Sequence, residues 1–494
     1  MIPEKPNLLC VFSDQQSFDM LGCAGNPQIK TPNLDAFAGK GVRFEHAVAN
    51  CPVCTPCRSM LLSGRHPLHN NCFDNDRRLL NRDEIGPGLG HVLRDAGYRM
   101  GYVGKWHLHG GDRDRPIPAG PDRQGFDDRF LSNNCHLNYH PDSCYYWTED
   151  GEKVMLGQWE AAGQTEQALA FLDESTKEKP FCLFVSWHAP HNHLGGNAKA
   201  YRGFDAPEAF KARYNEDEIV PRGQLPNTAE NRRMTLGYYA LCSEVDHHFG
   251  RLMEKLEEKG FAENTLVVFT SDHGETFGAH AAQCHKGNPE DVSVRIPLLM
   301  RLPGVLSADY TSRLLIGMLD VPPTLLGLMG HEVPSNWEGL DLSPAIRNRN
   351  DDAVDHVPIF NFKPSWRGVY TRQYTFAMEN IERTPDMHTR FGSDLPDQRK
   401  TVQNFNVLYD REEDPLQLNN LINTTGHLDT IWELTQRTHD WCAKFNDPFL
   451  SYKRLIDLVG DREDRTLIDL IAGVANHMDV SNTPFTASDK TQRE

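Results

Sequence analysis

Two apolar segments of the chain are each followed by polar side chains that could hold a metal ion. An Asp-Gln pair follows residues 7–12, and an Asp-His pair follows residues 265–270. Either pair alone is better explained as a cap on the following segment. In open α/β sheets, however, ligands gather beyond the carboxyl ends of the strands, so the two pairs together favour one shared site. Carboxylate and amide oxygens suit Ca²⁺ or Mg²⁺, with histidine a less usual addition. The predicted ligands are Asp14, Gln15, Asp272 and His273.

Three cysteines stand three residues apart in the segment Cys51-Pro-Val-Cys54-Thr-Pro-Cys57. Thr55 as an N-cap and Pro56 as the first helical residue predict a helix that begins just after Cys54. The free N–H groups and the dipole at a helix N-terminus favour an anion and a thiolate. The spacing also resembles half of a bacterial ferredoxin motif, so an iron–sulfur or structural metal site is an alternative. No fourth cysteine stands where that motif requires one, which weakens the alternative.

Short apolar segments alternate with helical patterns along the first 360 residues. This alternation predicts an α/β fold with a mostly parallel sheet. Between two of the segments, apolar residues recur at helical spacing from Leu241 to Leu256, and Gly260 follows as a stop, which predicts a long core helix. The predicted buried strands are Asn7 to Phe12, Arg99 to Val103, Phe181 to Trp187, Thr265 to Thr270 and Pro297 to Leu302.

The pattern changes after about residue 360. Residues 369–378 and 407–410 indicate strands, and residues 427–445 indicate a helix. We therefore predict two domains. They are a catalytic α/β domain of residues 1–360 and a smaller α+β domain of residues 361–494, whose tail has helical apolar spacing from Leu455 to Met478.

The composition is that of a soluble protein. The chain has 494 residues with 51 basic and 69 acidic side chains, a formal net charge of -18. This acidic balance argues against nucleic acid or an anionic membrane as the main partner. No apolar run approaches the roughly 18 residues of a membrane span, and the first six residues are too polar for a signal peptide, so we expect a cytoplasmic chain. The 12 cysteines are scattered, and most are expected to be buried thiols.

The segment Cys54-Thr-Pro-Cys-Arg58, followed by Ser63-Gly-Arg65, resembles the signature of the type I sulfatases of the alkaline phosphatase superfamily. In that family the first cysteine is oxidised to formylglycine after translation. Further segments resemble sulfatase landmarks, occur in family order and span nearly the whole chain, which is a stronger signal than a short cysteine motif alone. They are Asn7 to Asp14, Lys30 to Asp35, Gly104 to Leu108, Ala189 to His191, Ser271 to Glu275, Gly278 to His280 and Leu408 to Asp410.

The resemblance implies a fold and a reaction. The fold is alkaline-phosphatase-like, with a large, mostly parallel mixed sheet between helices and a smaller C-terminal α+β domain. The reaction is hydrolysis of a sulfate monoester, on an aryl or carbohydrate substrate, through a formylglycine hydrate derived from Cys54. One hydroxyl of the hydrate attacks sulfur, and the second later helps to expel sulfate by re-forming the aldehyde. A formylglycine-generating enzyme is then a partner in maturation.

The resemblance also implies roles for individual residues. Asp14, Gln15, Asp272 and His273 would hold calcium or magnesium with the modified Cys54 nearby, although a second Asp is usual at position 15 and Asn is frequent at position 273. Sulfate cleavage develops charge on the leaving oxygen, which a preorganised set of donors can stabilise. The family's cationic set corresponds to Arg58, Lys105, His107, His191 and Lys286.

Histidine titrates near neutrality and can protonate the leaving oxygen. The resemblance suggests His191 for this proton and His107 for holding the nucleophile. The other histidines near the motifs are interpreted as surface or structural residues. These are His188, His193, His280 and His285.

A close alternative is a phosphonate monoester or phosphodiester hydrolase, which shares the fold, the formylglycine and an Asp-Gln start. In that group the Lys and His of the Gly-Lys-Trp-His segment are typically replaced. Lys105 and His107 are both present here, which favours sulfate. A non-catalytic binding module is disfavoured, because the nucleophile, metal and cation positions are all retained.

Overall fold

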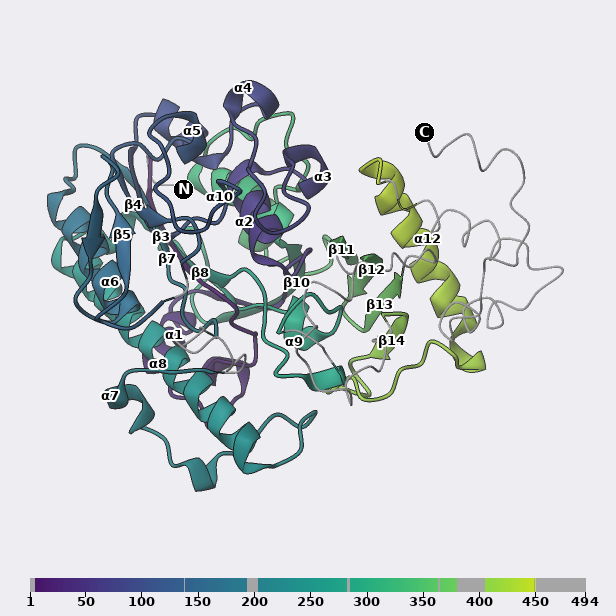
Figure 1. The fold of residues 1–494 in the computed structure, drawn as a ribbon. Helices are drawn as coiled ribbons and strands as arrows, with labels where there is room; N and C mark the ends of the chain where they lie inside the picture. Colours follow the sequence, from purple (N-terminus) through teal and green to yellow (C-terminus); the bar gives the residue numbers. More distant parts are fainter. Residues whose placement is uncertain are drawn as a thin grey trace.

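A computed structural model shows two β-sheets that lie side by side, with helices packed on both (Figure 1). It describes residues 5–136, 138–192, 203–281, 285–362, 365–379, 405–447 and 449. Among these residues, no helix has the length and apolar character needed to cross a membrane.

The larger sheet has ten described strands, and its centre is parallel. The central order is β8 (Thr265–Ser271), β1 (Asn7–Ser13), β7 (Phe181–Ser186) and β3 (Arg99–Lys105). These four strands lie where the apolar segments predicted strands. The strand predicted at 297–302 is β9 (Leu298–Arg301), which runs antiparallel to β8 and makes the sheet mixed. The remaining strands are β10 (Tyr310–Gly317) and β2 (Val42–Val48) beyond β8, and β4 (Arg129–Asn133), β5 (Tyr145–Trp147) and β6 (Lys153–Met155) beyond β3.

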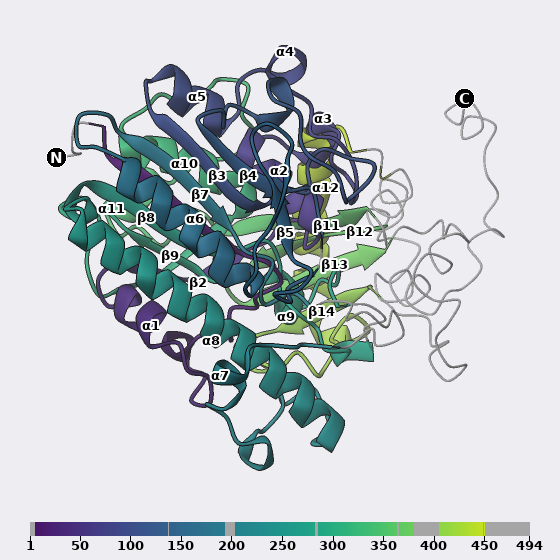
Figure 2. The ribbon, with the colours of Figure 1, turned by 60° about the vertical axis from the view of Figure 1, so that its left-hand side comes forward.

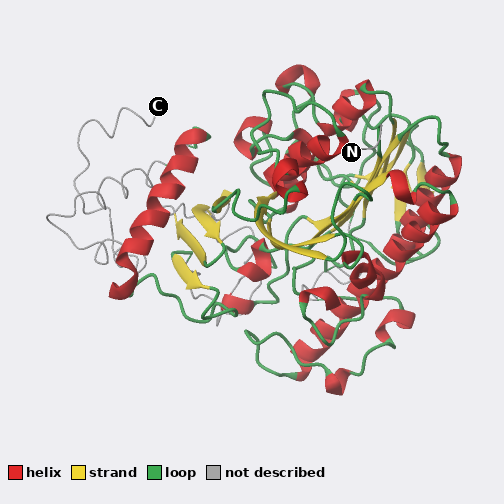
Figure 3. Ribbon diagram, turned by 180° about the vertical axis from the view of Figure 1, so that it is seen from behind, coloured by secondary structure: helices red, strands yellow, loops and turns green. Residues whose placement is uncertain are grey.

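Helices cover both faces of the large sheet, which explains why its central strands are apolar throughout. Along β1, Leu8, Cys10 and Phe12 face one core, and Leu9 and Val11 face the other. Figures 2 and 3 show the sheet between these two helical layers. The first core contains α2 (Cys54–Ser63), α5 (Leu89–Asp95) and α10 (Val321–Met329), and the second contains α1 (Pro32–Ala38), α6 (Glu160–Glu174) and α8 (Ala229–Glu258).

Helix α8 is the long helix that the sequence predicted, and Gly260 follows it in a left-handed conformation. It begins earlier than the apolar spacing indicated. Thr228 caps it by accepting a hydrogen bond from the backbone N–H of Asn231, so the capping residue rather than the apolar face sets the start of the helix.

The smaller sheet is antiparallel and packs one face against α12 (Leu428–Lys444) (Figure 1). The single strand predicted at 369–378 is wrong. Arg372 and Gln373 form a turn there, and Thr371 accepts a hydrogen bond from Tyr374 N–H, so the apolar run is a hairpin. The sheet is formed by β11 (His356–Phe362), β12 (Ser365–Thr371), β13 (Tyr374–Glu379) and β14 (Val407–Asp410).

The other face of the smaller sheet shares a hydrophobic core with the large sheet, through residues such as Val357, Trp366 and Tyr370. This sheet begins at His356, and the domain division after residue 360 stays a prediction. The predicted helical tail at 455–478 lies outside the described residues.

Candidate active site

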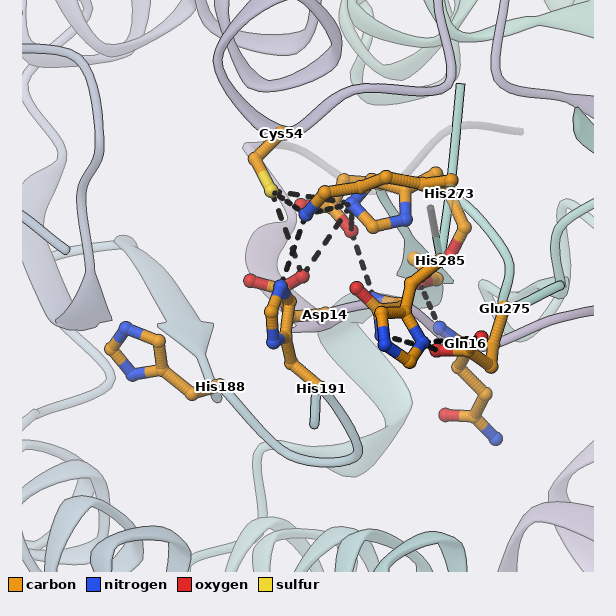
Figure 4. Close-up of polar contacts among 12 residues, drawn as sticks. Asp14, Gln16, Cys54, His188, His191, His273, Glu275 and His285 are labelled. Carbon is orange, nitrogen blue, oxygen red and sulfur yellow. Dashed lines mark hydrogen bonds and ion pairs between the residues drawn. The ribbon is translucent and has the colours of Figure 1, made fainter. Parts of the chain in front are cut away.

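The carboxyl ends of β8, β1, β7 and β3 meet at one edge of the large sheet, because these strands are adjacent and parallel. Ser13 at the end of β1 pairs in register with Ser271 at the end of β8, so Asp14 and Asp272 leave the sheet at the same level. The chain leaving β7 reaches His191, and β3 ends at Lys105. Helix α2 brings Cys54 to the same place (Figure 4).

Four buried side chains there form a group that could hold a metal ion. One ligand atom from each of Asp14, Cys54, Asp272 and His273 lies within 4.8 Å of the others. His273 Nε2 is 3.2 Å from Cys54 Sγ, 3.5 Å from Asp272 Oδ1 and 3.7 Å from Asp14 Oδ1. Three of the four predicted metal ligands are therefore brought together, along with the cysteine of the motif.

The fourth predicted ligand, Gln15, is buried beside this group. Its backbone N–H donates to Asp272 Oδ1 at 3.0 Å, and its side-chain Nε2 donates to Glu275 and Asn192. Its Oε1 is buried and has no hydrogen-bond partner among the described residues. A buried amide oxygen without a described partner, on a residue whose backbone contacts Asp272, is consistent with a ligand to a bound divalent cation.

Buried cations surround the carboxylates of the group. Arg58 donates through Nε to Asp272 Oδ2 at 3.0 Å and through Nη2 to Asp14 Oδ2 at 3.2 Å, and Lys105 Nζ also donates to Asp14. Burial opposes ionisation of Asp14, but the positive charges of Lys105 and Arg58 hold its pKa well below the usual range. Burial and the charge of Asp14 raise the pKa of Asp272.

The sulfur of Cys54 lies among positive charges. Lys286 Nζ donates to Cys54 Sγ at 2.8 Å, and the same Nζ is 3.0 Å from His191 Nε2 and 3.2 Å from His273 Nε2. Burial disfavours a thiolate, yet Lys105, Lys286 and His273 lower the pKa of Cys54 well below its usual value. This position therefore stabilises an anion, which is what a nucleophile needs.

His107 is held by residues that carried no signal in the sequence. Its Nε2 is 3.0 Å from Asp76 Oδ1, and Asp76 is fixed by two 2.8 Å hydrogen bonds from Arg113. Thr55 donates its hydroxyl to the backbone carbonyl of His107 at 2.8 Å. Burial opposes charging of His107, but Cys135, Asp76 and Cys54 raise its pKa to about 10. Asp76 belongs to no recognisable motif, so no signal in the sequence marks it.

His191 has one ring nitrogen bound to the backbone and the other toward the cluster. Its Nδ1 donates to the carbonyl of Asn192 at 2.5 Å, which leaves Nε2 facing Lys286. Burial and the charge of Lys286 lower the pKa of His191 to about 4. His188 lies apart from Cys54 and Asp14 in Figure 4, with its ring 2.8 Å from Glu160, which agrees with a structural role. His193 lies outside the described residues.

The predicted start of the cysteine helix, at Pro56, is wrong by two residues. Helix α2 begins at Cys54 itself, with Val53 at the N-cap, because the hydroxyl of Thr55 is engaged by His107 instead of capping the helix. Cys51 and Cys57 pack in the hydrophobic core, and burial raises the pKa of both thiols. Within the described part of the chain, the three cysteines form no common metal group, so the iron–sulfur alternative has no structural support.

Two family models match the chain. The sulfatase model matches residues 6–331, and the model described as N-sulphoglucosamine sulphohydrolase, C-terminal, matches residues 286–444. The first spans the large sheet and all of the site residues described above, from Asp14 to Lys286. The second spans the smaller sheet and α12.

Similar proteins cover most of the chain. An ulvan-active sulfatase of Formosa agariphila is 31% identical over 460 residues, which is 91% of this chain and 83% of that protein. An N-acetylglucosamine-6-O-sulfatase of Bacteroides thetaiotaomicron is 25% identical over 538 residues, covering 93% and 90%. A solved structure described under the metabolism of multiple glycosaminoglycans by Bacteroides thetaiotaomicron has a TM-score of 0.77 and 26% identity, covering 94% of this chain and 100% of that one.

Proposed function

This chain belongs to the sulfatase family and is a sulfuric ester hydrolase, and from that premise we propose that it cleaves a carbohydrate sulfate monoester at the cluster around Cys54. The names of the similar proteins support a sugar substrate. The observation that carries the proposal is the position of the Cys54 sulfur, 2.8 Å from Lys286 Nζ and 3.2 Å from His273 Nε2. A nucleophilic oxygen in place of this sulfur would lie among cations that can also bind a sulfate group.

Cys54 is the residue that we assign to the nucleophile, after its conversion to formylglycine by a formylglycine-generating enzyme. Hydrated formylglycine supplies one hydroxyl that attacks sulfur and displaces the alcohol, and a second whose deprotonation expels sulfate and re-forms the aldehyde. The cluster stabilises negative charge at this position, because the same cations already lower the pKa of the thiol.

The residues assigned to the metal are Asp14, Gln15, Asp272 and His273, with calcium or magnesium as the ion. A divalent cation bound there supplies a Lewis acid that offsets the charge of the sulfuryl oxygens. The fit is supported by the convergence of the carboxylates and by the orphaned Oε1 of Gln15.

Lys105, Lys286 and Arg58 are assigned to charge stabilisation, and His191 to the proton of the leaving oxygen. His191 is neutral in the resting site, because burial and Lys286 lower its pKa to about 4. An anionic sulfate placed against Lys286 and His191 raises the pKa of His191 and favours its protonated form. His107, fixed by Asp76, is assigned to holding the nucleophile.

Hydrolysis of phosphonate monoesters or phosphodiesters is the weaker alternative. The buried Lys105 and His107 are both in place beside the nucleophile position, as expected for a sulfatase. Side activity on phosphorus esters is compatible with this site, because both transition states develop negative charge on similar oxygens.

Mass analysis of one peptide tests the nucleophile. Trypsin releases residues 44–58, which contain Cys51, Cys54 and Cys57, from protein expressed together with a formylglycine-generating enzyme. We expect an aldehyde or its hydrate at Cys54 only. Three intact thiols under these conditions would contradict the formylglycine assignment.

Turnover of sulfated sugars then tests the substrate. We expect matured protein to release sulfate from a sulfated monosaccharide or oligosaccharide faster than from an aryl sulfate. Cys54→Ala is expected to lower turnover at least about 1,000-fold, because it removes the nucleophile. Cys57→Ala, in the core on the same helix, is the matched control, and we expect it to lower thermal stability without lowering turnover per folded molecule.

A further inference from the structure

Four side chains beside the metal-ligand group form a closed ring of hydrogen bonds. Gln15 Nε2 donates to Glu275 Oε2 at 2.5 Å and to Asn192 Oδ1 at 2.9 Å. His285 Nδ1 is 2.8 Å from Glu275 Oε1, and His285 Nε2 is 3.4 Å from Asn192 Nδ2. Gln15 and Glu275 are fully buried, Asn192 is buried, and Figure 4 shows the contact between Glu275 and His285. We call these four residues the amide ring.

The carboxylate of Glu275 dictates the orientation of every other member. A carboxylate only accepts hydrogen bonds, so it must face the amide N–H₂ of Gln15 and a protonated Nδ1 of His285. Nε2 of His285 is then an acceptor, which turns the N–H₂ of Asn192 toward it. The Oδ1 of Asn192 is left to accept the second N–H of Gln15.

This arrangement engages both N–H groups of Gln15 within the amide ring. Only its Oε1 stays outside, and that atom is buried with no partner among the described residues. The reversed amide would place two oxygens in contact at Glu275, which is strongly unfavourable. Glu275 is itself held in place, because its backbone N–H donates to Ser17 Oγ at 2.8 Å and its Oε1 accepts from the N–H of Phe277 at 2.6 Å.

We propose that the amide ring fixes Gln15 with Oε1 toward Asp14 and Asp272, and that Glu275 is the positioning residue that makes a neutral amide an effective metal ligand. An amide can present either a donor or an acceptor to a cation, whereas a carboxylate presents only acceptors. A glutamine ligand therefore needs a carboxylate behind it, and a carboxylate ligand at the same position does not. The inference rests on the metal assignment of the proposed function.

The test exchanges the amide and the carboxylate between positions 15 and 275. The Ca²⁺ affinity of each variant is measured by titration calorimetry on protein with an unmodified Cys54. Glu275→Gln is expected to weaken Ca²⁺ binding about 10- to 100-fold, the usual effect of losing a partner behind a metal ligand. Gln15→Glu alone places two carboxylates in contact and disrupts the ring. The double variant, Gln15→Glu with Glu275→Gln, again places a donor opposite an acceptor. We therefore expect the double variant to bind Ca²⁺ more tightly than the Gln15→Glu single variant.

Three controls separate the possible failures. Glu244→Gln replaces another buried carboxyl group, on α8 and outside the amide ring, and should leave the Ca²⁺ affinity within about twofold of the wild type. Asp272→Asn removes a proposed metal ligand, so the Ca²⁺ binding that remains in this variant measures ions bound elsewhere on the protein. Thermal unfolding without Ca²⁺ checks that each variant is folded.

An unchanged Ca²⁺ affinity in folded Glu275→Gln would overturn the inference. An equal loss of Ca²⁺ affinity when Glu275→Gln is added to the wild type and to the Gln15→Glu variant would overturn it as well. If the wild-type protein bound neither Ca²⁺ nor Mg²⁺ in a way that Asp272→Asn abolishes, both the inference and the metal assignment would be wrong. Glu275→Gln could weaken Ca²⁺ binding in the wild type and strengthen it in the Gln15→Glu variant, while the matured protein hydrolyses no sulfate ester. That result would support the amide ring and contradict only the proposed function.

Discussion

The two sheets support the buried cluster in different ways. The large sheet supplies side chains directly, since β8, β1 and β3 end at or beside Asp272, Asp14 and Lys105. The small sheet acts through the backbone. Its Trp366 Nε1 and Asn361 Nδ2 donate to the carbonyl oxygen of Gly287, at 2.8 and 3.0 Å, in the residue that follows Lys286.

The difference follows from the geometry of the sheets. Adjacent parallel strands bring their carboxyl ends to one edge, so several side chains can converge there. An antiparallel sheet packed against the side of that edge can instead hold the loop that carries Lys286. Gly287 has a φ of 92°, and an added Cβ would lie 2.9 Å from Asn361 Nδ2, so this approach depends on glycine.

The comparison predicts that charged contacts to a cluster side chain matter more than neutral contacts to its backbone. Among these supporting contacts, the largest effect is expected at Asp76, which holds His107 just beyond β3. Asp76→Asn keeps the shape but weakens the charged hydrogen bond that fixes the imidazole. We expect kcat to fall about 10- to 100-fold with a much smaller change in KM, measured on matured enzyme.

A second Asp–His pair in the same region provides the control. Asp122 lies 3.1 Å from His109, which is not part of the cluster. Asp122→Asn should leave kcat unchanged. Equal losses of kcat in both variants would mean that the surrounding loops, and not the orientation of His107, limit the reaction.

A smaller effect is expected from the small sheet. Trp366→Phe keeps the buried aromatic ring but removes the N–H that donates to Gly287. One neutral hydrogen bond contributes about 1 kcal/mol, so kcat/KM should fall about fivefold as Lys286 loses one of its supports.

Trp441→Phe is the matched control for this substitution. Trp441 Nε1 is buried without a partner among the described residues, so its loss removes no hydrogen bond. If Trp441→Phe lowered kcat/KM as much as Trp366→Phe, the effect would come from packing of the small sheet and not from the Gly287 contact.

The direct contribution of the large sheet was predictable from sequence, and the supporting contacts were not. Residues that follow parallel strands must lie at one edge, so the positions of Asp14, Asp272 and His273 followed from recognising two apolar strands. The partners of Gln15 stand 177 and 260 residues away along the chain, in loops whose paths no local pattern dictates. For this reason the sequence predicts a structural role for His285 and gives no signal for Asp76.

Local competition for hydrogen bonds explains the smaller errors. Thr55 is a good capping residue by type, but its hydroxyl donates to the carbonyl of His107, and α2 starts at Cys54, two residues before the predicted Pro56. The hairpin at Arg372 and Gln373 has no Gly, Pro, Asn or Asp to mark it, and the flanking apolar residues looked continuous. The cytoplasmic location stays a prediction.

The smallest effect on turnover is expected at Glu244. This residue is a buried ionisable group outside the site, so it should affect stability and not turnover. Burial alone raises the pKa of Glu244 from 4.5 to about 8, so the folded protein holds a proton there that the unfolded chain releases above about pH 4.5. Folded protein binds the extra proton between these values, and its stability should therefore fall as the pH rises from about 4.5 to about 8. Glu244→Gln removes the titration while keeping the shape. We expect a flatter dependence of Tm on pH, with the variant gaining most over the wild type near pH 8, and an unchanged kcat. A loss of kcat in folded Glu244→Gln would show that helix α8, which packs on the large sheet, also supports the site.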